Sequence, residues 1–236
     1  MREAGRVVGK VLEAVAREAK PGVTTAELDE KAEALCRQMG AVPAFKGYRG
    51  YPFALCCSLN EQVVHGFPSL EPLREGDILS MDFGVVLDGF YGDAATTVAV
   101  GQVGSEARTL MQATEASLAA GIEQARAGNR LGDISAAVQK VAEAAGFSVV
   151  RQFVGHGIGR GLHEEPQVPN FGLPGRGVRL KPGMVLAIEP MVNAGGYEVR
   201  ILKDGWTAVT VDGKLSAHFE HTVAVTDDGP RILSLP

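Results

Sequence analysis

The 236-residue sequence predicts an α+β fold, in which two related halves pack on one continuous antiparallel sheet covered by helices. The first observation is an internal repeat. LREGDILSMD at 73–82 is similar to LKPGMVLAIE at 180–189, and the two copies end in Asp82 and Glu189. Each copy looks like a turn followed by a strand, so each half is expected to add strands to the shared sheet.

Two helix-like segments are related by nearly the same offset. The first, 24–39, has Thr25 as a capping residue, and the second, 131–145, has Asp133 near its start. Both have apolar residues at helical spacing, and glycines bracket both. Chance similarity between ordinary segments is the alternative. Three segments aligned at nearly one offset favour duplication, and each half then reads as helix, helix and strands.

The composition limits the class of protein. The chain is 45% hydrophobic and 22% charged with a net charge of −5, which is typical of one enzyme domain over 1–236, with halves at about 1–108 and 109–236. The acidic balance argues against general nucleic-acid binding. No segment approaches the ~18 apolar residues of a membrane span, and the charged N-terminus does not resemble a signal peptide. Three cysteines, two of them adjacent, indicate a reducing cytoplasm rather than a disulfide framework.

A strand pair at 77–100 places two aspartates on one face of the sheet. The dipeptide Asp88-Gly89 between two strand-like runs predicts a two-residue hairpin turn, which pairs Leu87 with Phe90. In that register Asp82 and Asp93 lie one diagonal step apart, with Cα atoms roughly 7–8 Å from each other. A buried carboxylate pair is costly unless a positive charge compensates it.

The alternative is a solvated sheet face, and the apolar residues around the pair argue against it. A metal is then one way to compensate the two charges. Small residues nearby are expected to leave room for a ligand: Gly84, Gly92, Ala94 and Ala95.

Three further candidate ligands come from other segments. Glu189 ends the strand-like run VLAIE, before a proline that favours extended backbone. Glu220 lies in the strand-like run LSAHFEHTVAVT, with His218 on its own face and His221 on the other. His156 lies in GHGIGRGLHEEPQV, whose glycines are unlike a helix and whose proline is unlike a regular strand.

Each of these residues taken alone could be structural or solvated, so the set carries the argument. Four carboxylates and one imidazole suit a pair of divalent first-row metals. Because no thiolate is required, the set does not resemble a structural zinc site.

With these segments, the sequence resembles the bacterial type I methionine aminopeptidases, a peptidase family with the pita-bread fold. The resemblance covers essentially the whole chain and rests on the motifs NEQVVHGFP, SMDFGVVLDGFYGDAATTV, GHGIGRGLHEEPQV, KPGMVLAIEPMV, LKDGWTAVT and SAHFEHTVAVT. It implies removal of the initiator methionine from nascent proteins when the next residue is small. In the implied mechanism, a hydroxide activated by two metals attacks the scissile carbonyl.

The resemblance also implies a role for individual residues. The five metal ligands fall on Asp82, Asp93, His156, Glu189 and Glu220. By resemblance, Asp93 and Glu220 bridge the metals, Asp82 binds one of them, and His156 and Glu189 bind the other. Glu189 is also the candidate proton shuttle.

Two more histidines and an apolar pocket complete the implied site. His163 is expected to face the substrate carbonyl and the oxyanion, and His65 the scissile nitrogen. The alternative for both is structural hydrogen bonding. The methionine pocket falls on Phe45, Tyr48, Tyr51, Cys56, Leu162 and Trp206. Relatives often carry a smaller residue at 45 and phenylalanine at 162, so the shape of the pocket is expected to differ here. Relatives also usually have a few residues before the MREAG segment.

The implied cofactors are two divalent metal ions, drawn from cobalt, manganese, iron and zinc, with cellular supply deciding among them. The implied partners are nascent polypeptide N-termini. The family's role is compatible with ribosome association, and a monomer is the default expectation. No membrane or specific nucleic acid is implied.

Three rival functions remain at this stage. The first is a dimetal peptidase of other specificity, which would share every ligand. The second is a non-catalytic binding protein on the same fold. The third is a nucleotide-binding loop at 155–159, whose spacing does not match G-x-G-x-x-G.

Overall fold

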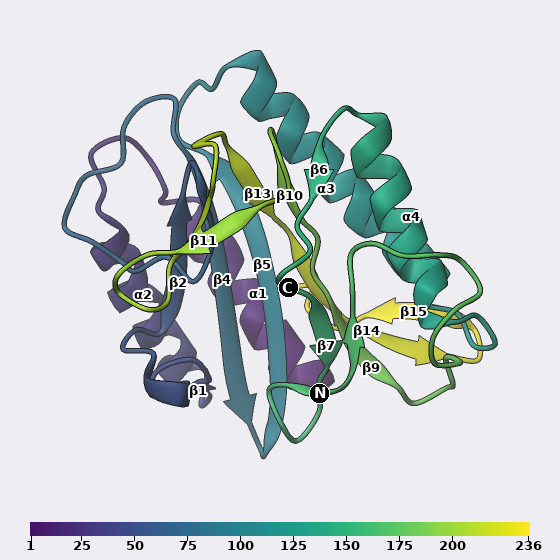
Figure 1. Cartoon of the computed structure of the whole chain (residues 1–236). Helices are drawn as coiled ribbons and strands as arrows, with labels where there is room; N and C mark the ends of the chain where they lie inside the picture. The colour runs from purple at the N-terminus through teal and green to yellow at the C-terminus, as the bar shows by residue number, and fades with distance from the viewer.

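The computed structural model describes residues 1–236 and places four α-helices around a nine-stranded antiparallel sheet (Figure 1). The strand order is β1-β4-β5-β14-β9-β7-β8, with β2 also paired to β4 and β15 to β14. The bounds are β1 Val42–Pro43, β2 Leu55–Leu59, β4 Ile78–Leu87, β5 Phe90–Ala99, β7 Gly155–Gly157, β8 Glu164–Val168, β9 Val185–Ile188, β14 Glu220–Thr226 and β15 Gly229–Ile232. Strands from both halves of the chain therefore share one sheet, which confirms the expected fold class.

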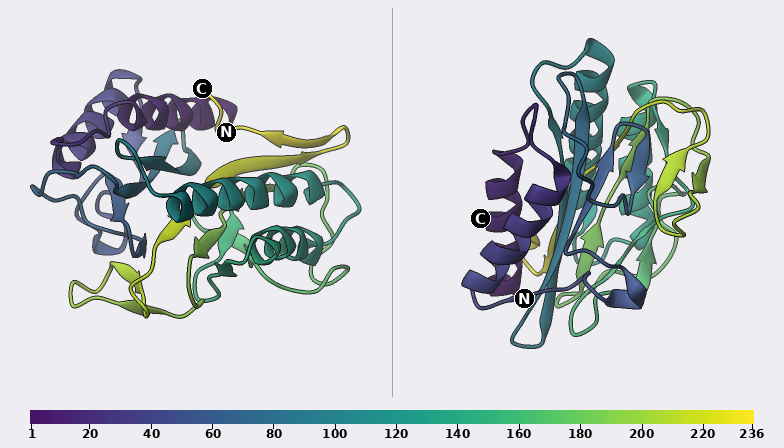
Figure 2. Two further views of the ribbon diagram at one scale, coloured as in Figure 1. Left: turned by 90° about the horizontal axis from the view of Figure 1, so that it is seen from above. Right: turned by 90° about the vertical axis from the view of Figure 1, so that its left-hand side faces the viewer.

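Two small sheets that the sequence did not predict accompany the large one. One has the order β13-β10-β6 and the other β11-β12-β3. Their bounds are β3 Gln62–Val64, β6 Ser148–Val149, β10 Met191–Asn193, β11 Val199–Ile201, β12 Ala208–Thr210 and β13 Ser216–His218. In the side view of Figure 2, β11 and β12 lie on the side of the large sheet opposite α1 and α2. Helices thus cover one face of the large sheet, and short strands with their connecting loops cover part of the other.

The four helices are α1 Arg2–Ala16, α2 Thr25–Gln38, α3 Ser105–Gln124 and α4 Leu131–Ala144. Helices α2 and α4 match the two segments expected from the repeat. The cap of α2 differs from the expectation, because Thr24 rather than Thr25 precedes the helix. The Thr24 side chain accepts from the Glu27 amide, and the Glu27 carboxylate accepts from the Thr24 amide, a reciprocal cap. The Thr25 hydroxyl instead accepts from the Ser69 amide.

The β4–β5 hairpin has the register that its turn predicts. Leu87 pairs with Phe90, the first of ten residue pairs that extend to the far end of the hairpin. Asp82 and Asp93 are therefore on the same face, on neighbouring strands and one diagonal step apart. The Thr222 side chain on β14 accepts from the Asp93 amide and donates to the Asp93 carbonyl, so the backbone here is held on both sides.

The largest core cluster lies between this hairpin and α1 and α2, and includes Val8, Val11, Leu28, Phe83 and Val85. Two glycines of the hairpin are required by packing, Gly92 on this helix-covered face and Gly84 on the opposite face, next to Phe45. A Cβ on Gly92 would lie 2.9 Å from backbone atoms of α1, and one on Gly84 would lie 2.6 Å from the Phe45 ring. The expectation that these two glycines leave space for a ligand is wrong, because a helix and an aromatic ring occupy that space.

The glycine-rich stretch forms two short antiparallel strands, β7 and β8. Pro166 lies within β8, which is tolerated because β8 is the last strand of the sheet and needs no second partner. The β7 glycines are required by neighbouring backbone. A Cβ on Gly155 would lie 2.3 Å from the Ala187 carbonyl oxygen, and one on Gly157 at the same distance from that of Glu165.

The run LSAHFEHTVAVT is interrupted at Phe219. Its first part, β13, pairs with β10 in a small sheet, and its second part, β14, crosses the large sheet. One strand-like run thus belongs to two sheets, and this break changes how His218 and Glu220 approach the site.

Candidate metal centre

A cavity of about 180 Å³ is lined by Asp82 and Asp93, which lie on the sheet face opposite α1 and α2. All six residues expected to form the methionine pocket line it: Phe45, Tyr48, Tyr51, Cys56, Leu162 and Trp206. Six of the seven expected metal or catalytic residues line it as well: His65, Asp82, Asp93, His156, His163 and Glu189. Glu220, the seventh, is 2% exposed and lies behind them on β14. The structure thus brings every proposed site residue to one place.

Two groups of potential ligands overlap at the inner end of the cavity. In the first, ligand atoms of Asp93, His156 and Glu220 lie within 4.8 Å of one another. The second satisfies the same limit with Glu189, His218 and Glu220. Glu220 belongs to both groups, in keeping with the bridging position that the resemblance implies for it.

Several buried polar atoms of these side chains have no hydrogen-bond partner. They are Oδ1 of Asp82, Oδ1 of Asp93, Oε1 of Glu220 and Nε2 of His218. Buried polar atoms are nearly always paired in folded proteins, so four unpaired atoms at one point indicate a missing partner. The atoms are mainly carboxylate oxygens, so the partner they fit is a cation.

The electrostatics of the metal-free site lead to the same conclusion. Burial raises the pKa of Asp82 to about 7 and that of Glu189 to about 8. Burial also raises the pKa of Glu220 and of Asp93, and the neighbouring acids add to it. None of these carboxylates forms an ion pair with a lysine or arginine. A divalent cation would compensate the charges that burial otherwise disfavours.

The hydrogen bond of His156 prepares its ring for a metal. Its Nδ1 lies 2.9 Å from the carbonyl oxygen of Gly157, so Nδ1 carries the proton and donates it there. The Nε2 lone pair then faces the carboxylates, 3.6 Å from Oε1 of Glu189 and 4.0 Å from Oδ2 of Asp93. Burial lowers the pKa of His156, which keeps the ring neutral, as a ligand must be.

His163 and His65 lie on different sides of the cavity. His163 is at the solvent-exposed rim, where its Nδ1 lies 2.9 Å from the Tyr48 hydroxyl and its ring centroid 4.3 Å from that of His156. His65, with a positive φ of 60°, contacts the edges of Phe153 and Trp206. Burial lowers the pKa of His65 to about 4, so the ring is neutral at pH 7.

The cavity wall contains residues that sequence reasoning did not identify: Arg49, Val64, Phe153, Val154 and Met191. His218 was noted only for the face of its strand. The apolar members had no chemical signal, because an apolar residue in a short strand or loop is indistinguishable in the sequence from a core residue. Arg49 had none either, since it is an exposed arginine on a short 3₁₀ turn, Tyr48–Gly50.

Comparisons with known proteins agree with this geometry. A model of metallopeptidase family M24 matches residues 1–227. A methionine aminopeptidase from Clostridium perfringens is 57% identical over all of this chain and 94% of its own length, and methionine aminopeptidase 1 from Bacillus subtilis is 52% identical over 99% and 94%. The crystal structure of a methionine aminopeptidase from Thermotoga maritima superimposes with a TM-score of 0.99 at 46% identity, covering all of this chain and 95% of that one.

A prolidase from Pyrococcus furiosus is more distant. It superimposes with a TM-score of 0.81 at 21% identity, over all of this chain and 63% of that one. It therefore shares the fold alone.

Proposed function

The chain belongs to metallopeptidase family M24, and we propose that it is a metal-dependent aminopeptidase that removes the initiator methionine from nascent polypeptides when the next residue is small. One observation supports this most strongly. Two overlapping groups of carboxylates and imidazoles, several of them with buried polar atoms that have no hydrogen-bond partner, lie at the inner end of a largely apolar cavity. The cavity can accommodate the apolar side chain of one substrate residue. The peptide bond after that residue would then lie next to the acids.

The proposal includes two divalent ions, held by Asp82, Asp93, His156, Glu189 and Glu220, with Asp93 and Glu220 bridging. Cobalt, manganese, iron and zinc all suit this ligand set. When bound, such ions make a water nucleophile available at neutral pH and polarise the scissile carbonyl.

The cavity wall provides specificity for methionine in this proposal. Tyr51, Phe45 and Leu162 are each less than 10% exposed and form an apolar cluster with Cys56. The Tyr51 hydroxyl donates to backbone carbonyls of Leu55 and Gly66, which leaves its ring to contact the substrate. A flexible thioether side chain matches such a wall.

His163 is proposed to stabilise the oxyanion. If the Tyr48 hydroxyl donates to Nδ1 of His163, the ring proton lies on Nε2 and can be donated into the cavity. A fixed donor of this kind acts where negative charge develops in the transition state. Tyr48 stacks near the same ring, with centroids 5.3 Å apart, and limits its rotation.

His65 and Glu189 are proposed to handle the proton and the leaving amine. Glu189 lines the cavity and belongs to the ligand cluster, so its carboxylate lies within reach of both the nucleophile and the substrate. It can accept the proton of the nucleophile and pass it to the amine. His65 is neutral at pH 7 and lies toward the Trp206 side of the cavity, where it can contact the scissile nitrogen.

The remaining parts of the proposal concern the cellular setting and the domain. We propose a monomer of one domain that acts in the cytoplasm on N-termini emerging from the ribosome. All three cysteines are free and buried, which suits a reducing compartment. None of the helices combines the length and apolar character that crossing a membrane requires.

The test uses a peptide panel Met-X-Gly, with X varied from glycine to large side chains. Protein treated with a chelator should be inactive, and adding manganese, cobalt or iron should restore activity. Peptides with a small residue at X should be cleaved preferentially. Full activity in metal-free protein would exclude the metal mechanism. Preferential cleavage before proline, or cleavage of N-acetylated peptides, would indicate a different peptidase.

A further inference from the structure

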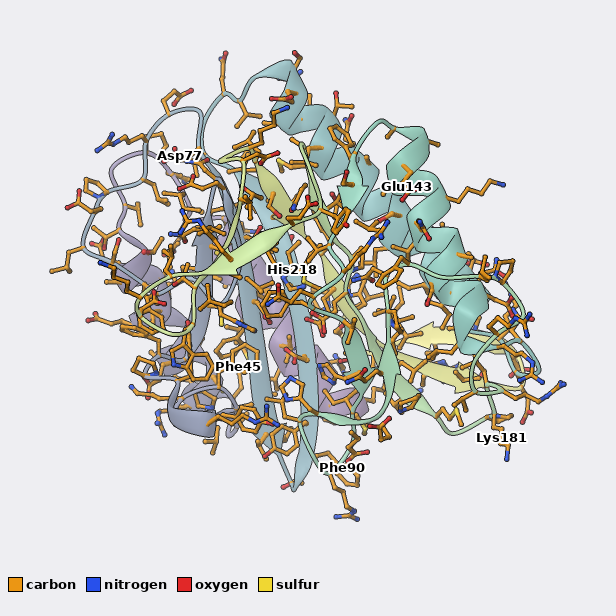
Figure 3. All side chains as sticks on the ribbon, in the orientation of Figure 1. Phe45, Asp77, Phe90, Glu143, Lys181 and His218 are labelled. Carbon is orange, nitrogen blue, oxygen red and sulfur yellow. The ribbon has the colours of Figure 1, made fainter.

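His218 is a buried imidazole that the five proposed ligands leave out. It ends β13 near the centre of the molecule (Figure 3) and is 1% exposed. Its Nε2 is one of the four buried atoms without a hydrogen-bond partner, and it lies in the group with Glu189 and Glu220. A buried, unpaired ring nitrogen that lies within a cluster of acids requires an explanation.

The nearest acid to His218 is Glu189. Nε2 of His218 lies 3.4 Å from Oε2 of Glu189, while Oε1 of the same carboxylate lies 3.6 Å from Nε2 of His156. Glu189 is therefore between two imidazoles, with one facing each oxygen. No other side chain donates a hydrogen bond to this carboxylate, and only its backbone carbonyl is held, by Asn170 at 3.0 Å.

The backbone of His218 is held through both its amide and its carbonyl group. The Thr97 hydroxyl on β5 accepts from the His218 amide at 2.9 Å and donates to the His218 carbonyl at 2.8 Å. Ser80 on β4 in turn hydrogen-bonds the Thr97 hydroxyl. Two strands of the large sheet thus determine where the ring is placed, which is the precision that a partner of a metal ligand needs.

We propose that His218 is a positioning residue for Glu189. Its Nε2–H donates to Oε2, which turns Oε1 toward His156 and the metal. The inference rests on the proposed function, because it assigns Glu189 to the metal centre. The 3.4 Å separation is slightly longer than the 2.7–3.2 Å typical of N–H···O bonds, and a small rotation of either side chain brings the two atoms into that range.

The alternative is that His218 is itself a ligand, and two variants separate these roles. His218→Gln keeps an N–H donor of similar reach, and His218→Ala removes it. Hydrogen-bond partners of metal ligands typically contribute ~10–100-fold to metal affinity. We therefore expect the alanine variant to bind Co²⁺ or Mn²⁺ ~10–100-fold more weakly, and the glutamine variant to bind close to wild type.

The readouts are metal affinity by titration calorimetry and the visible absorption spectrum of the Co²⁺ form. The spectrum of His218→Gln should match wild type in band position, because the ligand set is unchanged. His221→Gln is the matched control. His221 lies three residues away and hydrogen-bonds Ser234 rather than the acids, so affinity should not change. Should the alanine cavity unfold the protein, His218→Leu replaces it, since leucine fills the space without donating.

Two results would overturn the inference. Wild-type affinity in the variant without a donor would show that His218 does not position Glu189. A glutamine variant as weak as alanine, with a shifted Co²⁺ spectrum, would make His218 a direct ligand. If the wild-type protein binds no divalent ion, the proposed function itself fails, which is a separate outcome.

Discussion

Two buried aspartates of this molecule have similar exposure and opposite surroundings. Asp29 on α2 is 8% exposed, and its Oδ1 accepts from the amides of Ala54 and Leu55 at 2.9 and 2.8 Å. Asp93 on β5 is 4% exposed, and its Oδ1 has no partner. Burial raises the pKa of both, but only around Asp29 do hydrogen bonds oppose that rise appreciably.

The contrast extends to the two faces of the sheet. On the helical side, the half-buried imidazole of His221 is hydrogen-bonded to Ser234 at 2.8 Å. On the cavity side, His218 and the acids are not satisfied by protein atoms. Burial of a polar group is therefore a weak indicator of function in this fold. The lack of a partner is the better one, because a structural polar group is held by hydrogen bonds and a ligand-binding one is available for its ligand.

The largest effect is expected for Asp93→Asn. Asp93 is proposed to bind both ions. Its replacement should therefore lower activity by more than the ~10–100-fold typical of residues that only hydrogen-bond to a metal ligand. The metal-free protein should keep or gain stability, because a neutral amide avoids the cost of a buried charge. Metal content, kcat/KM and thermal unfolding of the metal-free form check this. Near-normal activity would show that the bridging assignment is wrong.

The second prediction separates the two histidines of the glycine-rich stretch. His163→Ala should lower kcat by ~10²–10³ with metal content unchanged, as for loss of one oxyanion donor. His156→Ala should instead lose metal. Both variants change the same stretch, so general misfolding would affect them alike. Metal occupancy and kcat measured together decide, and the reverse pattern would exchange the two roles.

The third prediction concerns pH, and its effect is smaller. Asp82 and Glu189 have folded pKa values of about 7 and about 8, above their ordinary 3.8 and 4.5. Between these values the folded metal-free protein holds protons that the unfolded chain has released. Its free energy of unfolding should therefore fall as pH rises toward 8. Metal binding needs ionised acids, so affinity should rise ~10-fold per pH unit for each proton released.

Thermal unfolding at pH 7 and pH 8, with and without metal, tests this prediction. The lowered pKa of His65 has the opposite influence, but only below its ordinary value of 6.5, outside this window. A metal-free protein that is more stable at pH 8 than at pH 7 would contradict the proposed origin of the effect.

The smallest effect on activity is expected at Asp29, the buried aspartate whose carboxylate is hydrogen-bonded to backbone amides. Asp29→Ala leaves two buried amides unpaired and should lower the free energy of unfolding by ~1–3 kcal/mol. Metal affinity and kcat per folded molecule should not change. Asp29→Asn keeps an acceptor oxygen and serves as the control. If Asp29→Ala lost metal instead, paired and unpaired buried acids could not be distinguished in this way.

Local sequence signals were sufficient for much of the fold. The dipeptide Asp88-Gly89 determined the hairpin register, because a two-residue turn permits one pairing of the strands that it joins. Apolar spacing located α2 and α4. The cap of α2 was placed one residue late, because Thr24 and Thr25 are equally good caps and only the Glu27 contact distinguishes them.

For the site, the sequence by itself predicted the four acids and His156 as one ligand set, and the resemblance added His65, His163 and the proposed role of each residue. Their residue types and spacing are properties of the chain. Only the tertiary structure decided that Phe45 fills the space beside Gly84, and that the chain breaks at Phe219 and brings His218 to Glu189. Each of these contacts joins residues about 30 or more positions apart, and packing between distant segments leaves no local pattern to read.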